Sequence, residues 1–181
     1  MRAVAITLDR LSVWLYRIAL TGAVIAVLVM AFSAMWQVIA RYALSAPPVW
    51  TEEAARRAMV WAGMLGASCA FRARLDPTLF PGMVAIQGRL GLVLALIRGV
   101  GVALFALPVL WYSLFGPNMT FARGFLGRSL ERTAEMIPVQ MIWFTAAVPI
   151  AFALILLHML AGLAMRLASL PQAEDLKERH P

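Results

Sequence analysis

The stretch Arg41–Arg57, RYALSAPPVWTEEAARR, is a dense polar segment that separates two long apolar runs. Its adjacent prolines, Pro47 and Pro48, form a tight turn between the two runs. The residues after the turn have the pattern of a helix start, in which Thr51 caps the free backbone N–H groups. Glu52 and Glu53 then lie in the first turn, where the helix dipole favours negative charge. The stretch therefore predicts that one helix ends before the prolines and another begins after them.

Composition places the rest of the chain in a lipid bilayer. Of the 181 residues, 62% are hydrophobic and 14% are charged, and the mean hydropathy is +0.82. A soluble domain carries about 25% charged residues. The formal charge of +7 would suit a nucleic-acid binder, but the arginines fall between the apolar runs and do not gather on one solvated face, so no nucleic-acid partner is expected. The single cysteine, Cys69, excludes a disulfide framework and a Cys-pair metal or redox site within one chain.

Four apolar runs, with their flanks, are long enough to cross a bilayer. About 20 helical residues span the roughly 30 Å of hydrocarbon. The uncharged run Ile18–Ala40 reaches this length alone, whereas Ala58–Phe71 must recruit Thr51–Arg57 at its outer end. The predicted spans cover approximately residues 15–42, 51–72, 90–115 and 138–166. They form one four-helix membrane domain over residues 1–170, followed by a short polar tail over 171–181 that is expected to fray.

Two of these spans carry further local signals. The segment Met1–Arg17 has apolar residues at roughly helical spacing, so it either lies on the membrane surface or extends the first helix inward. The run that follows lacks a convincing cleavage site, which favours a retained anchor over a secretory signal peptide. In the fourth span, Pro138 suits the first turn of the helix, and Pro149 is expected to bend it.

The distribution of basic residues predicts the orientation. Four spans put both termini on one side, and that side carries ten of the sixteen Lys and Arg residues, against six on the other. By the positive-inside rule, both termini are cytoplasmic and the stretch 41–57 faces outward. Trp50 then lies at the outer membrane–water boundary, where aromatic rings gather. The sequence thus predicts an all-α integral membrane protein with four transmembrane helices.

The charged residues around the turn are spaced for ion pairs. Glu52 with Arg56, and Glu53 with Arg57, are four residues apart and can pair on the side of the second helix. Arg41 is also placed to pair with Glu52 or Glu53 across the turn, which would fix the first two helices to each other. The alternative is that these charges only mark the interface.

The second span has a face that is nearly free of side chains. Ala62, Gly66 and Ala70 repeat every four residues, and Gly63 widens the face. Helices in lipid associate through such small-residue faces, because no water is present to drive their association. This pattern predicts close packing against another helix, although small residues are common in any membrane helix.

A transport or catalytic site of its own is not visible in this chain. A transporter places an acid, a His or an interrupted helix at mid-membrane, yet none of the nine acids falls inside an apolar run. His158 is the single ionisable candidate deep in a span, and we interpret it as a hydrogen-bonded packing residue. One membrane histidine cannot supply a bis-His haem site. We expect no cofactor, no metal and no enzymatic activity.

One enzyme hypothesis deserves a test. Glu52, Glu53 and Arg57 match the Glu-Glu-xxx-Arg signature of intramembrane metalloproteases that resemble prenyl-protein endopeptidases. In such enzymes a Glu activates water and further helices supply histidines. The histidines of this chain, His158 and His180, do not lie in the Phe-xxx-His or His-xxx-Asn/Asp contexts that those enzymes use. An orphan structural membrane protein is the other alternative.

The central stretch carries a resemblance to a known family. It resembles the small membrane subunit of tripartite ATP-independent periplasmic (TRAP) transporters at Arg41-Tyr42, at Pro48, and at Trp50-Thr51-Glu52-Glu53 followed by Arg56. The likeness extends over nearly the whole chain, at Trp61, Gly66-Ala67, Phe71-Arg72, Ile137-Pro138 and Pro149. The chain departs from the family at 74–77, where Arg-Leu-Asp-Pro replaces the usual Gly and His, so no role of that loop is carried over.

The resemblance implies a function through assembly. In such transporters a large membrane subunit carries the sodium and substrate sites and moves like an elevator, while a periplasmic binding protein delivers an organic acid. The small subunit braces the moving part in the bacterial inner membrane. The large subunit is thus the obligate partner, the binding protein a transient partner, and membrane lipids the surrounding medium. The residues that would contact the substrate lie on another chain, so its identity cannot be inferred here.

Overall fold

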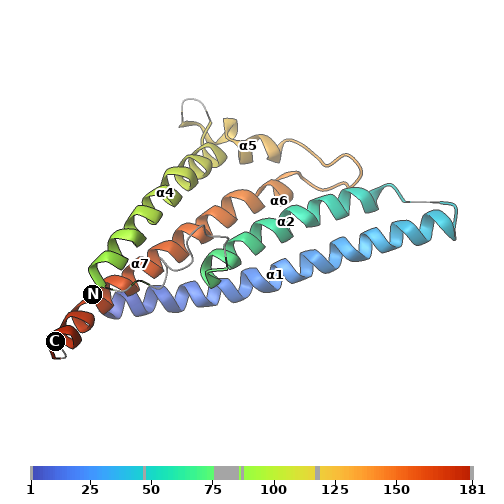
Figure 1. Cartoon of the computed structure of the whole chain (residues 1–181). Helices are drawn as coiled ribbons and strands as arrows, with labels where there is room; N and C mark the ends of the chain where they lie inside the picture. The colour runs from blue at the N-terminus through green and yellow to red at the C-terminus, as the bar shows by residue number, and fades with distance from the viewer. Residues whose placement is uncertain (1, 47, 76–85, 87, 117–118, 180–181) are drawn as a thin grey trace.

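Long helices, joined at one end by short ones, make up the described part of the chain (Figure 1). The computed structural model describes residues 2–46, 48–75, 86, 88–116 and 119–179. The long helices are α1 (Arg2–Tyr42), α2 (Trp50–Ala73), α4 (Gly88–Leu114) and α7 (Ala147–Arg179). The short ones are η2 (Phe121–Arg123), α5 (Phe125–Leu130) and α6 (Ile142–Thr145).

Helix α7 lies at the centre of the arrangement. α1 and α2 pack against each other and both contact α7, and α4 packs on the other side of α7 (Figure 1). The start of α1 and the end of α7 lie at the same end of the bundle (Figure 1). The turn between α1 and α2 lies at the opposite end, towards which α6 and α5 also lie (Figure 1). The polar stretch 41–57 is therefore brought close to residues more than 70 positions later in the chain.

The first helix is one continuous element of 41 residues. At 1.5 Å per residue it is about 60 Å long, roughly twice the hydrocarbon thickness. The N-terminal segment therefore extends the first helix, which was one of the two options that the sequence left open. α1 ends at Tyr42 and α2 begins at Trp50, on either side of the prolines.

A line of small residues forms the contact face of α1. Buried Ala or Ser recurs at every seventh position, at Ala5, Ser12, Ala19, Ala26, Ser33 and Ala40. A seven-residue repeat keeps one face of a helix turned towards a partner helix when the two wind around each other in a left-handed supercoil. Small side chains on that face let the two helices approach closely. Leu65 and Cys69 of α2 pack against this face.

Three segments are long and apolar enough to cross a membrane among the described residues: Arg2–Tyr42, Gly88–Leu114 and Ile142–Ser169. Their outward side chains are apolar, as in Leu28 and Leu104, which are 63% and 77% exposed. α2 runs for 24 residues beside them but carries four charges in its first two turns. The chain is therefore a multi-pass helical membrane protein, and the fourth span and the orientation stay predictions.

The fourth predicted helix starts later than the sequence suggested. We placed Pro138 in its first turn, but residues up to Met141 are not helical and α6 begins at Ile142. Thr133 and Gln140 form an isolated antiparallel bridge that closes a turn around Pro138. The prediction for Pro138 is therefore wrong, because the backbone there folds back on itself and makes no helical turn.

Pro149 removes one hydrogen bond from the fourth helix, as its chemistry requires. α6 ends at Thr145 and α7 starts at Ala147, and Ala146 between them keeps a right-handed helical backbone (φ −63°, ψ −19°). A proline at position 149 cannot donate a hydrogen bond to the carbonyl of Thr145, four residues earlier. Beyond the membrane-length part, α7 continues to Arg179, so the backbone of the tail that we expected to fray is helical through residue 179.

The connector after α2 begins with a defined helix end. Arg74 adopts the left-handed conformation with φ 55°, and its N–H and that of Leu75 bond to the carbonyls of Phe71 and Ala70. These bonds satisfy carbonyls that the end of the helix would leave free. Of the positions 74–77 where the chain departs from the family pattern, Asp76 and Pro77 lie outside the described residues, as do residues 78–85.

Candidate functional site

A buried carboxylate at the start of α2 is the centre of the candidate site. Glu53 is only 2% exposed. Its Oε2 accepts hydrogen bonds from two consecutive backbone N–H groups, those of Met136 at 2.7 Å and Ile137 at 3.1 Å. Its Oε1 accepts from Nη2 of Arg57 at 2.9 Å. Consecutive N–H groups form a concave site for an anion, so the carboxylate holds a segment more than 80 residues away in sequence.

That segment is a short hairpin-like turn, residues 132–141, which we call the connector hairpin. The N–H of Ala134 bonds to the carbonyl of Val139 at 2.9 Å, and that of Met141 bonds to Arg132 at 2.8 Å. These bonds fold the backbone so that residues at its tip direct their N–H groups at Glu53. The hairpin thus provides an anion site made of backbone.

Two further residues on the same face of α2, one and two turns after Glu53, contact α6. The guanidinium of Arg57 lies 5.3 Å from the centroid of the Phe144 ring of α6, in a cation–π arrangement. Nε1 of Trp61 donates to the carbonyl of Trp143 at 2.9 Å. Residues 53, 57 and 61 therefore contact first the connector hairpin and then α6. We call this set of three α2 residues the α2 clamp.

A further bond ties α6 back to α5. Oγ1 of Thr145 donates to Oγ of Ser129 at 2.8 Å, and the Ser129 hydroxyl donates to the carbonyl of Leu126 at 2.7 Å. Short polar side chains close to helix ends can satisfy backbone carbonyls in this way. The elements at this end of the bundle, from α5 through α6, are therefore connected to α2 by hydrogen bonds.

The sequence predicted part of this clamp. The pairing of Glu53 with Arg57 is confirmed at 2.9 Å, and that of Glu52 with Arg56 is present at 3.9 Å with both side chains 59% exposed. An exposed pair of this kind contributes little to stability. The contacts to the connector hairpin were missed, because nothing in the sequence indicates which distant backbone meets Glu53.

Two predictions at the turn are wrong. The residue before α2 is Val49, and no side chain caps the helix there. The hydroxyl of Thr51, which is fully buried, donates instead to the carbonyl of Pro48 at 2.7 Å. Thr51 thus stabilises the turn and does not cap the helix. Arg41 does not form the predicted pair across the turn, since the two acids bind the arginines four residues later in their own helix.

The remaining predicted site residues lie on the surface of the bundle. Arg41 is exposed, and so are the rings of Tyr42 and Trp50. Ala62, Gly66 and Ala70 are half-buried, because α2 turns Leu65, Ser68 and Cys69 inward in their place. A Cβ atom added at Gly66 or Gly63 would meet no atom of the chain within 4 Å. The small-residue face is therefore open in the described part of this chain.

The geometry speaks against the protease hypothesis. Glu52 and Glu53 lie at the end of the bundle that holds the connector hairpin, whereas His158 lies beside Ser12, near the start of α1, with Nδ1 2.7 Å from the Ser12 hydroxyl. His180 lies outside the described residues. No three His, Cys, Asp or Glu side chains gather to hold a metal ion in the part of the chain that the structure describes. The Glu-Glu-xxx-Arg signature here serves a structural contact.

The fold defines a class of protein. It is a multi-pass membrane protein, because its helices are apolar enough to cross a membrane, and a buried carboxylate forms a structural polar site at one end of the bundle. Residues 30–169 match the model of the family "Tripartite ATP-independent periplasmic transporters, DctQ component". The match spans more than half of the chain, so the chain belongs to this family, as the resemblance predicted. Membership makes it a component of a membrane transporter.

A curated relative agrees with the family. The sialic acid TRAP transporter small permease protein SiaQ of Vibrio cholerae is 31% identical over 106 residues. The aligned region covers 58% of this chain and 61% of that relative. The chain thus matches somewhat less than two thirds of the length of this small permease protein.

Proposed function

We propose that this chain braces the large membrane subunit of a TRAP transporter in the bacterial inner membrane. In this role it supports the sodium-driven uptake of an organic acid that a periplasmic binding protein delivers. The observation that carries the proposal is a set of polar links at both ends of the bundle. Such links fix helices relative to one another, which is the property that a scaffold for a moving partner requires.

The two ends use different chemistry. At the end where the chain starts, Asp9 of α1 accepts from Arg72 of α2 at 2.7 Å, and Ser12 of α1 bonds His158 of α7 at 2.7 Å. At the other end, Glu53 binds the connector hairpin. Partly buried ion pairs and hydrogen bonds across helices resist sliding and separation of the helices, since each shift would leave a desolvated polar group unpaired.

The open face of α2 is the proposed contact with the large subunit. α2 carries charged residues and falls short of the apolarity of the three membrane-crossing segments. A helix of this composition is more stable against protein than against lipid. Its face around Ala62, Gly66 and Ala70 is half-buried, and at Gly63 and Gly66 it has open space within the described chain for a helix at close distance.

A bulky residue on this face tests the contact. The substitution Gly66→Leu is expected to reduce copurification of the large subunit about tenfold, because overpacking at a close helix contact costs about 1–3 kcal/mol. The thermal stability of the isolated chain should stay unchanged, since a side chain at Gly66 enters open space. The matched control is Gly101→Leu on α4, where a Cβ also meets no atom within 4 Å. Equal retention of the large subunit by both variants would remove α2 from the interface.

We also propose that both termini are cytoplasmic and that the α2 clamp lies on the periplasmic side. Its support is the excess of basic residues on the side of the termini. In a Cys69→Ser background, a cysteine introduced by Ser45→Cys, in the exposed turn after α1, should react with a membrane-impermeant maleimide in intact spheroplasts. A cysteine from Leu75→Cys, which is 78% exposed after α2, should react only after the membrane is opened. The reverse pattern would invert the orientation.

A further inference from the structure

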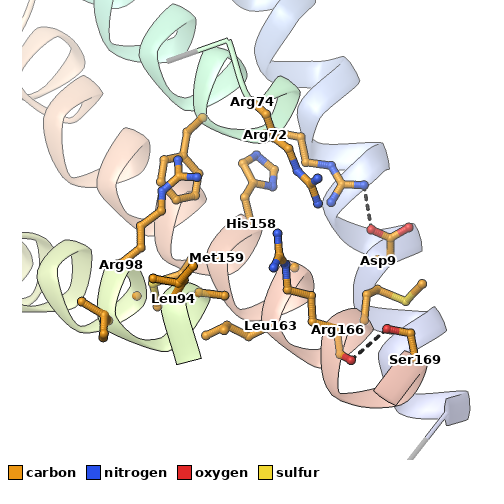
Figure 2. Close-up of a pocket in the computed structure, with 16 residues that line it drawn as sticks. Asp9, Arg72, Arg74, Leu94, Arg98, His158, Met159, Leu163, Arg166 and Ser169 are labelled. Carbon is orange, nitrogen blue, oxygen red and sulfur yellow. Dashed lines mark hydrogen bonds and ion pairs between the residues drawn. The ribbon is translucent and has the colours of Figure 1, made fainter. Parts of the chain in front are cut away.

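A cavity of about 910 Å³ opens between α4, α7 and the end of α2, on the end of the bundle that holds the start of α1 (Figure 2). It lies at the end opposite to the α2 clamp, and its lining includes Asp9, Arg72 and His158, which also form the polar links at that end. The lining combines a cluster of cationic side chains with a row of apolar ones. This combination calls for a ligand that has both an anionic and an apolar part.

Four arginines face one aspartate around the cavity: Arg72, Arg74, Arg98 and Arg166 against Asp9. Figure 2 shows the four arginine side chains directed into one shared space from three different helices and the turn that follows α2. Asp9 is bound to Arg72 at 2.7 Å, so the cluster keeps a clear excess of positive charge. Contacts hold the arginines in place: Arg166 donates to the carbonyl of Gly91 at 2.9 Å, and Arg98 lies 5.0 Å from the centre of the Phe71 ring.

A buried histidine lies among these arginines. His158 is 3% exposed, and its Nδ1 lies 2.7 Å from the hydroxyl of Ser12. Its other ring nitrogen, Nε2, is buried and has no hydrogen-bond partner within the described residues. When Ser12 donates to Nδ1, the proton of the neutral ring is on Nε2. The ring then carries an unused donor that is buried beside the lining of the same cavity.

The apolar side of the cavity comes from the two helices that are apolar enough to cross the membrane. Leu94 and Ile97 of α4 and Met159 and Leu163 of α7 line it. Basic pockets between transmembrane helices bind the head groups of anionic lipids, whose chains then follow the helices. A soluble anion would use the arginines but would leave this apolar wall without a partner.

We propose that this cavity binds an anionic phospholipid, with the phosphate among Arg98, Arg166 and His158 and an acyl chain along α4 and α7. The bound lipid would fill the space between α4 and the end of α2 and would link these two helices. The inference is independent of the interface proposed for α2. A contact with acidic side chains of the large subunit is the competing occupant.

Native mass spectrometry of the full chain, delipidated in detergent, tests the proposal. Titration with dioleoyl phosphatidylglycerol is expected to give a one-to-one adduct, and dioleoyl phosphatidylcholine should bind at least about fivefold more weakly. Arg98→Gln should weaken the phosphatidylglycerol adduct about fivefold, the effect of one basic residue near an anionic head group. The control Arg128→Gln, at an exposed position of α5 away from the cavity, should bind the lipid like the unmodified chain.

Several outcomes would overturn the proposal. Equal binding of the two lipids would show that the arginines do not select the head group, and this comparison needs no variant to fold. Displacement of phosphatidylglycerol by millimolar inorganic phosphate alone would show a simple anion site. Loss of the adduct when the large subunit is copurified would show that the partner occupies the cavity. An unchanged adduct in Arg98→Gln, with an unchanged Tm of the lipid-free chain, would place the lipid elsewhere.

Discussion

Replacing Glu53 with Gln is expected to lower the Tm of the detergent-solubilised chain by roughly 5–10 °C. The reason lies in the three donors that converge on this carboxylate. Arg57 would lose its partner while its side chain stays only 26% exposed, and the N–H groups of Met136 and Ile137 would share a single neutral acceptor. Breaking a buried ion pair by changing one partner leaves an uncompensated charge. Thermal unfolding followed by tryptophan fluorescence measures the shift.

The neighbouring acid provides a matched control. Glu52 forms an ion pair of the same spacing with Arg56, but at 3.9 Å and with both side chains 59% exposed. Because exposed pairs contribute little, Glu52→Gln should leave the Tm nearly unchanged. We expect the same order in assembly: Glu53→Gln should weaken copurification with the large subunit, and Glu52→Gln should not. Equal shifts in the two variants would mean that the hairpin contact is not what holds this end of the bundle.

The second large effect is expected on the contact face of α1. Ala19 is 3% exposed and packs against Leu65 and Cys69 of α2. Ala19→Leu inserts three carbons between helices that the seven-residue repeat of small residues brings close together. Overpacking of this kind costs about 1–3 kcal/mol, which lowers the Tm by about 2–10 °C for a chain of this size. The measurement is the same thermal unfolding curve.

The control for this substitution lies on the same helix. Ala34 is exposed, so Ala34→Leu adds the same side chain on the lipid-facing side and should leave the Tm close to that of the unmodified chain. A Tm loss confined to Ala19→Leu would assign the cost to the α1–α2 contact. If both variants unfold alike, helix propensity or detergent contact would explain the loss, and the repeat would have no special role.

Together these contacts describe a bundle whose stability comes from both of its ends. Near the start of α1, an ion pair and a buried serine–histidine contact join α1 to α2 and α7. Near the turn, the α2 clamp joins α2 to the connector hairpin and α6. The small-residue face of α1 lies between them. This arrangement gives a physical basis for a brace, because the helices cannot slide without breaking a polar contact at one end.

Much of the helical organisation followed from local sequence. Runs of about 20 apolar residues and the paired prolines determine where α1 ends and α2 begins, because these signals act within a few residues of the backbone. The Glu53–Arg57 pair also follows from four-residue spacing on one helix. The central motif was enough to identify the family, which the family model confirms over residues 30–169.

The wrong predictions came from treating local signals as sufficient. Pro138 has the right chemistry for a helix start, yet the connector hairpin takes it into a turn because Thr133 and Gln140 pair across it. Thr51 has the right chemistry for a cap, yet its hydroxyl bonds backward to Pro48. In both cases a contact from outside the segment, or from its preceding turn, overrides the local preference.

By itself, then, the sequence determined the class of protein, the course of its long helices and the family, since hydrophobicity, proline and motif spacing are properties of contiguous residues. Only the tertiary structure decided which acid is buried, what Glu53 binds and where the arginines gather. Those outcomes depend on groups from different elements, such as Glu53 and Met136, which lie 83 positions apart, or Asp9 and Arg72, which lie 63 apart. How α1, α2, α4 and α7 pack decides whether such groups meet. Packing of whole helices, and not any one segment, places them within hydrogen-bond distance.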